Sequence, residues 1–306
     1  MSNEDASSPT RTGPTRAGRV ALVGRPNVGK STLLNAILGE PIAITSAHPQ
    51  TTRDLVRGVV TIEDTQYVFV DTPGVHAART RLGHHMNEAA RSTAREADAV
   101  VLVVEPEPRD EDEALAAELV PARTVLAVNK VDRAKDKTKL LPLIAAHAER
   151  RPYAAIVPVS ARRADGVDRL LAEVRTLLPE QPFLYEPDTL SDQPERFFVA
   201  EFVREQILQH TRQEVPHGVA VVVERFDEGG KVPHIELAIH VAREAHKKIL
   251  IGAGGTMLKR IGTAARARVE KMLGRHVHLK LWVRVTPDWM NDPARLKELG
   301  YGGEQR

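Results

Sequence analysis

The chain has 306 residues, a length that favours about two domains. Hydrophobic residues make up 42% of it, which excludes wholesale disorder, and the lack of cysteine excludes disulfides, thiolate metal sites and cysteine nucleophiles. The net charge is only +2, and no apolar run approaches the ~20 residues of a membrane-spanning helix. The N-terminal residues carry no apolar signal-peptide core. These features predict a soluble, cytoplasmic protein.

The small net charge hides an asymmetry along the chain. Residues 1–194 carry 24 basic and 27 acidic side chains, whereas residues 195–306 carry 19 and 14. Between Arg243 and Arg284, eleven basic residues stand against two acidic ones, a net charge of +9. A local excess of this size indicates a polyanionic partner. The alternative is a pair of basic helix faces without a ligand.

Residues 1–18 are rich in serine, threonine, proline and charge, and predict a disordered tail. Between residues 19 and 181, short β-rich runs alternate with helix-length stretches. The predicted strands are 20–23, 59–62, 67–71, 100–104, 124–128 and 155–158, and the predicted helices are 31–38, 82–94, 110–119 and 165–178. This alternation predicts an α/β domain whose mostly parallel sheet has helices on both faces.

Residues 182–194 predict a linker, because prolines interrupt a polar stretch without helical or strand periodicity. Residues 195–306 predict a second, smaller domain. Its expected elements are a helix over 194–210, strands over 219–226 and 235–242 joined by a turn at 227–230, a glycine-rich loop at 252–255, a helix ending at 272 and a strand over 276–285.

The first chemical motif is a phosphate-binding loop. The residues Gly24, Arg25, Pro26, Asn27, Val28, Gly29, Lys30 and Ser31 fit G-x-x-x-x-G-K-[ST] between a predicted strand and a helix that continues with Thr32. The N–H groups of such a loop face phosphates at a helix N-terminus. Lys30 supplies charge to the β and γ phosphates, and the Ser31 hydroxyl can bind Mg²⁺. The motif does not separate ATP from GTP, and a chance glycine-rich turn is the alternative.

The second motif, Asp71-Thr72-Pro73-Gly74, ends an apolar strand. An acidic residue there is expected to bind Mg²⁺ through water, and the Gly74 backbone can approach the γ-phosphate because no Cβ intervenes. Between the two motifs lies the polar stretch 49–54, in which a threonine can reach Mg²⁺ when a γ-phosphate is present. We favour Thr52 over Thr51. Ordinary turns and loops are the alternatives for both stretches.

The third motif, Asn129-Lys130-Val131-Asp132, follows another predicted strand. The Asp132 carboxylate can accept from N1–H and the exocyclic amine of guanine, which adenine cannot reproduce. Asn129 either reaches the base edge or braces the loop, and the stem of Lys130 can cover the ring. After the next strand, Ser160-Ala161 can offer a backbone N–H to the guanine oxygen. Three such motifs in order, each at a strand end, predict guanine-nucleotide binding.

These motifs resemble those of the translation-factor class of GTPases. The fusion to a basic glycine-loop domain resembles the Era family, ribosome-assembly GTPases with a C-terminal KH domain, over nearly all of residues 19–301. The resemblance implies a P-loop GTPase domain followed by an α+β type II KH domain. It also implies Mg²⁺-dependent hydrolysis of GTP to GDP and phosphate, binding of 16S rRNA near its 3′ end, and a role in maturation of the small (30S) ribosomal subunit. A monomer is expected; peripheral contact with the inner face of the cell membrane is left open.

Phosphoryl transfer requires positioning and charge neutralisation more than covalent chemistry. Ras-like enzymes place a glutamine after the second motif, where this chain has the apolar Val75. The resemblance implies that K⁺, bound by Asn27, supplies the missing charge stabilisation. Lys30, Thr52 and Gly74 complete the expected catalytic set. The neighbouring His76 is interpreted as a solvated loop histidine.

The loop Gly252-Ala253-Gly254-Gly255 matches G-x-x-G, which in KH domains clamps the backbone of single-stranded RNA. The family often has a lysine inside this loop, and this chain has none. The expected RNA-binding residues are the loop and the nearby cations Lys247, Lys248, Lys259, Arg260 and Arg266. Arg268 lies on the same predicted helix, and Trp282 is expected in the core of the last strand.

Two other functions remain open at this level. One is a constitutive RNA-binding chaperone in which the nucleotide is structural. The other is a related GTPase for tRNA modification or large-subunit assembly, which the single GTPase domain followed by the glycine-loop module disfavours.

Overall fold

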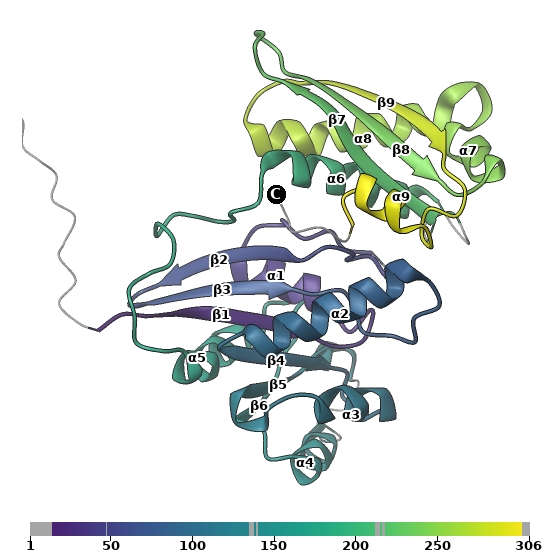
Figure 1. Ribbon diagram of the computed structural model, residues 1–306. Coiled ribbons are helices and arrows are strands. Elements are labelled where there is room, and N and C mark those ends of the chain that lie inside the picture. The colour runs from purple at the N-terminus through teal and green to yellow at the C-terminus, as the bar shows by residue number, and fades with distance from the viewer. Residues whose placement is uncertain are drawn as a thin grey trace, which may run out of the picture.

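The computed structural model describes residues 14–46, 48–134, 138, 140–211, 215 and 218–301 (Figure 1). Most of the predicted tail lies outside these residues, although β1 (Arg16–Val23) already begins inside its last three positions. Within the described residues, six strands form one sheet in the order β2-β3-β1-β4-β5-β6. Besides β1, these strands are β2 (Val56–Ile62), β3 (Thr65–Asp71), β4 (Ala99–Val104), β5 (Thr124–Val128) and β6 (Ala155–Pro158). Only β2 pairs antiparallel there, which confirms the mostly parallel sheet.

Helices cover both faces of this sheet (Figure 1). On one face, α1 (Lys30–Leu38) and α5 (Val167–Leu177) bury their apolar side chains against β1, β3, β4 and β5. On the other face lie α2 (Arg81–Glu96), α3 (Asp110–Ala117) and α4 (Leu140–Arg150). Helix α4 was not among the predicted elements. Helix α1 ends at Leu38 and is capped by Gly39, whose φ of 71° is the left-handed conformation that glycine adopts without strain.

The second domain contains a three-stranded sheet in the order β7-β8-β9. Strands β7 (Val219–Asp227) and β8 (His234–Val241) are antiparallel, and β9 (His278–Val285) runs parallel to β8. The helices are α6 (Glu195–His210), α7 (Glu244–Ile251), α8 (Thr256–Leu273) and α9 (Pro293–Glu298). The topology α-β-β-α-α-β, with α9 added, is an α+β type II KH domain. The sequence analysis missed the short helices α7 and α9.

The expectation that Trp282 lies in the core was wrong. Its neighbours Leu281 and Val283 pack toward the helices of the domain, so Trp282 lies on the opposite face of the sheet and is only half-buried. There Lys280 and Arg284 lie 5.6 and 5.7 Å from the centre of its ring.

The segment between α5 and α6, which connects the two domains in Figure 1, is bonded to the first domain. The Leu190 carbonyl accepts from the N–H of Val59 at 2.8 Å, and the Gln193 side chain accepts from the N–H of Arg57 at 3.0 Å. The guanidinium of Arg57 also pairs with Asp192 at 2.7 Å. This stretch therefore follows β2, the edge strand of the large sheet, and leads into the second domain.

Candidate nucleotide and RNA sites

The phosphate-binding loop joins the end of β1 to the start of α1. Gly29 has a φ of 104°, and a Cβ on it would lie 2.3 Å from the Asn129 amide nitrogen, so only glycine fits. The buried Lys30 ammonium donates to the Gly24 and Arg25 carbonyls at 2.9 and 3.1 Å. Burial lowers the pKa of Lys30 to about 8. The loop thus curls around its own lysine.

Three oxygen-bearing side chains meet beside this lysine. The Asp71 carboxylate accepts from the Ser31 hydroxyl at 2.5 Å and from the Thr52 hydroxyl at 3.3 Å, and the two hydroxyls lie 2.9 Å apart. Burial raises the pKa of Asp71 to about 6 against the opposing charge of Lys30. Its other oxygen, Oδ1, is buried and has no hydrogen-bond partner in the described part of the chain. Such a set of oxygens suits a hard divalent cation such as Mg²⁺.

The neighbouring threonines have other partners. The Thr51 hydroxyl donates to the His48 carbonyl at 2.6 Å, so of the two threonines in this stretch it is Thr52 that faces Asp71. Thr72 is fully buried, and its hydroxyl donates to the Leu22 carbonyl at 2.7 Å. Thr72 therefore holds the strand end and does not face the cavity.

Gly74 follows Pro73 and packs directly on the phosphate-binding loop. A Cβ at this position would lie 2.6 Å from the backbone nitrogen of Pro26. The next residue, Val75, donates its N–H to the Gly24 carbonyl at 3.2 Å. The sequence suggested glycine here because its backbone can approach the γ-phosphate. The close approach of the Pro26 backbone is a second reason.

His76 is not the solvated loop histidine that we expected. Its ring lies between two segments of the site, with Nδ1 2.9 Å from the Gly74 carbonyl and Nε2 2.8 Å from the Gln50 amide nitrogen. Gln50 has a left-handed φ of 61°. The histidine therefore connects the stretch around Thr52 to the stretch around Gly74.

The predicted base-recognition residues lie at the ends of β5 and β6. Asn129 braces the loops: its amide donates to the Val28 carbonyl at 2.8 Å and accepts from the Ala161 N–H at 3.0 Å. Asp132 accepts from the Ser160 hydroxyl at 2.7 Å, a hydrogen bond that lowers the pKa of the carboxylate. The Ser160 N–H donates to the Asp165 carbonyl. The backbone N–H that we expected this stretch to offer to the base is therefore paired within the protein, whether it comes from Ser160 or from Ala161.

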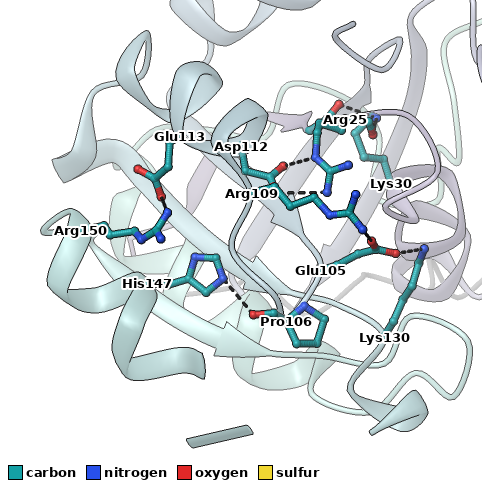
Figure 2. A network of polar contacts seen from close by, with 11 residues as sticks. Arg25, Lys30, Glu105, Pro106, Arg109, Asp112, Glu113, Lys130, His147 and Arg150 are labelled. Carbon is teal, nitrogen blue, oxygen red and sulfur yellow. Dashed lines mark hydrogen bonds and ion pairs between the residues drawn. The ribbon is translucent and has the colours of Figure 1, made fainter. Parts of the chain in front are cut away.

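Two acidic residues that the sequence analysis missed hold these loops together (Figure 2). Glu105, just after β4, accepts from the Lys130 ammonium at 2.5 Å, and the same ammonium donates to the Asn27 carbonyl at 2.6 Å. Asp112 of α3 binds Arg25 with two hydrogen bonds of 2.7 and 3.1 Å. Lys130 therefore spans from the base-recognition loop to the phosphate-binding loop, and the Arg25 side chain points toward α3.

These segments enclose a cavity of about 360 Å³. Its lining includes Asn27 and Thr32 from the phosphate-binding loop and α1, Thr52 and Gly74 from the two following motifs, and Lys130 from the base-recognition loop. The structure thus brings the three motifs, far apart in sequence, to one edge of the sheet.

The glycine loop of the second domain lies between α7 and α8. Gly252, Gly254 and Gly255 all have positive φ, and Ala253 between them is exposed. The cations Lys248, Lys259, Arg260 and Arg266 are exposed as well, and Lys247 is half-buried. Arg268 differs: it pairs with Glu205 and lies 4.2 Å from the centre of the Phe202 ring. Arg268 therefore faces α6, and it also donates to the Pro41 carbonyl of the first domain at 2.8 Å.

Comparison with known proteins identifies both domains. Residues 19–130 match the family described as 50S ribosome-binding GTPase, and residues 214–290 match the KH domain family. The GTPase Era of Geobacter metallireducens is 47% identical over 294 residues, which cover 94% of this chain and 98% of that protein. The chain belongs to the Era family of GTPases.

Other Era proteins agree with this assignment. The Era of Lactobacillus delbrueckii subsp. bulgaricus is 43% identical and covers 95% of this chain and 98% of its own. The structure of a point variant of Aquifex aeolicus Era bound to GDP·AlF4⁻ superposes with a TM-score of 0.90 at 37% identity, over 94% of this chain and 99% of that one. A structure of Era in complex with MgGDPNP and nucleotides 1506–1542 of 16S ribosomal RNA gives the same score, identity and coverage.

Membrane-spanning helices and clusters of metal-binding side chains were both considered for residues 14–46, 48–134, 138, 140–211, 215 and 218–301. None of the helices there is long and apolar enough to cross a membrane. No group of three or more histidine or acidic side chains that could hold a metal occurs among them.

Proposed function

We propose that this chain binds GTP in the 360 Å³ cavity, hydrolyses it with Mg²⁺ and K⁺, and in this way controls binding to 16S rRNA near its 3′ end during maturation of the 30S subunit. One observation carries the proposal: Ser31, Thr52 and Asp71 converge beside Lys30 in a chain that also carries an exposed glycine loop. The Era structure with MgGDPNP and a 16S rRNA fragment supports both halves of it.

The residues at the phosphate end fit a magnesium nucleotide. Ser31 and Thr52 would hold Mg²⁺ directly and Asp71 through water, and the ion supplies charge neutralisation between the β and γ phosphates when bound. Lys30 would exchange its bonds to the Gly24 and Arg25 carbonyls for phosphate oxygens. The Gly74 backbone, held against Pro26, would lie beside the γ-phosphate. The remaining members of the loop, Val28, Gly29 and Thr32, and those of the second motif, Thr72 and Pro73, would shape the site through their backbone.

Guanine would be selected by Asp132. Its carboxylate is already negative and oriented by Ser160, as a double acceptor for the base requires. Asn129 and Ala161 would fix the two loops around the base, and Lys130 would close one side of the pocket from its position between Glu105 and Asn27.

The potassium proposal rests on Val75 and Asn27. Val75 can neither donate nor accept a proton through its side chain, and Asn27 lines the cavity next to Lys30. An amide oxygen is a suitable ligand for a monovalent cation, which would supply positive charge at the phosphates. We expect faster turnover in KCl than in NaCl at equal ionic strength, and loss of that difference in Asn27→Ala. Equal turnover in both salts would remove K⁺ from the account.

The RNA proposal rests on the exposed loop 252–255 and on Lys247, Lys248, Lys259, Arg260 and Arg266. Because the loop lacks a charge, Ala253 offers a direct test: its side chain is exposed and its replacement meets no strained backbone. Ala253→Lys should tighten binding of a 16S 3′-end oligonucleotide, and Ala253→Asp should weaken it. Gly252 is a poorer test site, since a Cβ there would lie 2.8 Å from that of Met257.

The domain boundaries belong to the proposal as well, with one change to the predicted tail over 1–18 and GTPase domain over 19–181. Because β1 begins at Arg16, the GTPase domain starts there; it is followed by a linker over 182–194 and a KH domain over 195–306. A monomeric state and a cytoplasmic location belong to the proposal too; peripheral contact with the inner face of the cell membrane stays open.

The experiment that tests the function is GTP turnover with and without the RNA oligonucleotide. Mg²⁺-dependent release of phosphate that changes when RNA is added supports an enzyme switch. RNA binding with no hydrolysis under any of these conditions would instead favour a constitutive RNA chaperone with a structural nucleotide.

A further inference from the structure

Arg53 follows Thr52 directly, yet its side chain lies against the second domain. The side chain is 3% exposed and its guanidinium donates a hydrogen bond to the carbonyl of Val219, the first residue of β7. The guanidinium also lies 5.8 Å from the centre of the Trp289 ring. Since consecutive Cα atoms are about 3.8 Å apart, a displacement of Thr52 also displaces Arg53.

The segment that follows Gly74 reaches the same surface. Leu82 and Met86, in the first turns of α2, are buried in one cluster with Trp289. The N–H of Leu82 donates to the Met290 carbonyl at 3.0 Å. Both segments that flank the proposed γ-phosphate position therefore contact one small part of the KH domain.

The residues of the KH domain at this contact are buried and packed on one another. Trp289 is fully buried, its indole N–H donates to the Gly218 carbonyl at 3.2 Å, and its ring stacks on Tyr301 at 5.7 Å. Tyr301 and Leu299 follow α9, which packs in the same cluster. A change in the position of Arg53 or of α2 would thus move β7 and the C-terminal segment together.

We propose that Arg53 is the positioning residue that couples the nucleotide to the orientation of the KH domain, by holding Val219 and the Trp289–Tyr301 pair from the Thr52 side. The inference rests on the proposed function, in which Thr52 and Gly74 face the γ-phosphate. With GTP both segments are fixed and hold the aromatic pair between them; once the γ-phosphate leaves, both are released and the domain contact shifts. The cation over the indole ring and the hydrogen bond to a buried carbonyl both need the guanidinium.

The chain offers a matched pair of arginines for the test. Arg57 lies four residues further on, and its guanidinium pairs with Asp192 at 2.7 Å. Arg53→Met removes the guanidinium that makes the proposed contact. Arg57→Met makes the same chemical change at an arginine that pairs with Asp192 instead, and serves as the control. Because the sequence contains no cysteine, Leu141→Cys and Val232→Cys, at side chains 73% and 41% exposed, place one dye on each domain.

Two quantities are measured for each variant, with GDP and with a non-hydrolysable GTP analogue. They are the energy transfer between the dyes and the ratio of affinities for the 16S 3′-end oligonucleotide. For the unsubstituted chain and Arg57→Met we expect a nucleotide-dependent transfer and a ratio of about 5–150. For Arg53→Met we expect the same energy transfer with GDP and with the analogue, and a ratio of RNA affinities within about twofold of one. Its affinity for the analogue should stay within about threefold of that of the unsubstituted chain. Arg53→Lys, which keeps the charge, should recover part of the ratio.

The outcomes separate the inference from the function. A full ratio in Arg53→Met, or loss of nucleotide binding as the reason for its low ratio, overturns the role of Arg53 and leaves the proposed function intact. A ratio of one in the unsubstituted chain overturns the switch and the inference together. Trp289→Phe changes the same contact from the KH domain and is measured in the same way. If the ratio of RNA affinities is unchanged in both Trp289→Phe and Arg53→Met, the contact has no role in coupling.

Discussion

The pair between Arg25 and Asp112 provides the sharpest test of how the phosphate-binding loop is held. Asp112 is 3% exposed and Arg25 15%, and two hydrogen bonds join them. Asp112→Asn keeps the volume but leaves the guanidinium without its counter-charge. Removing one partner of a fully buried pair costs about 3–5 kcal/mol, and hydrogen bonds to charged groups contribute about 1.5–3 kcal/mol. Since Arg25 retains some contact with water, we expect a loss of about 2–3 kcal/mol in the free energy of unfolding.

Glu113→Gln is the matched control. Glu113 adjoins Asp112 and pairs with Arg150, but these side chains are 28% and 41% exposed, so the expected loss is at most about 0.5 kcal/mol. Urea denaturation of both variants measures the difference. The double variant Arg25→Met with Asp112→Asn should lose less than the sum of the single losses, because the unpaired charge is gone. Equal stability of Asp112→Asn and Glu113→Gln would refute the reasoning.

Asp112→Asn should also bind GTP more weakly, by up to about tenfold, because Arg25 belongs to the phosphate-binding loop and Asp112 holds it against α3; a nucleotide titration measures it, and an unchanged affinity would show that the loop needs no support from α3. Asp132→Asn is expected to weaken GTP by about 10–100-fold and to favour xanthosine triphosphate, since an amide donates where that base has a carbonyl; unchanged GTP affinity would remove Asp132 from base recognition. Burial lowers the pKa of His240 from its usual 6.5, so the folded state holds the neutral ring and the unfolded state takes up the proton first. The free energy of unfolding should therefore fall as the pH drops below about 6.5, and less steeply in His240→Asn; equal slopes in urea denaturation at several pH values would contradict this.

Much of the nucleotide site could be predicted because its residues act through local patterns. The glycines and Lys30 stand at fixed spacing between a strand and a helix, and Asp71 and Asn129 each follow an apolar strand. Parallel strands place those ends at one edge of the sheet, so local motifs imply a common site. Thr52 could be preferred over Thr51 in advance, and the structure places it beside Asp71.

The rest depends on contacts that no local pattern records. Glu105 and Asp112 reach Lys130 and Arg25 across the fold, and in the sequence they resemble any exposed acidic stretch. Arg268 was indistinguishable from its basic neighbours until Glu205 lay beside it. Trp282 alternates correctly within its strand, but alternation does not say which face the helices cover. We expected a backbone N–H of Ser160-Ala161 to face the base, and the sequence did not reveal that the Asp165 carbonyl and the Asn129 side chain accept these hydrogen bonds.

The measurement that tests the central claim most directly is the reciprocity between nucleotide and RNA. At one fixed salt concentration, the affinity of the 16S 3′-end oligonucleotide is measured for the apo, GDP and GTP-analogue forms, and analogue affinity is measured with and without saturating RNA. A GTP-driven switch requires that RNA tighten the analogue by the same factor by which the analogue tightens RNA, a factor of about 5–150. Equal RNA affinity in all three forms, together with analogue affinity that RNA leaves unchanged, would contradict the account.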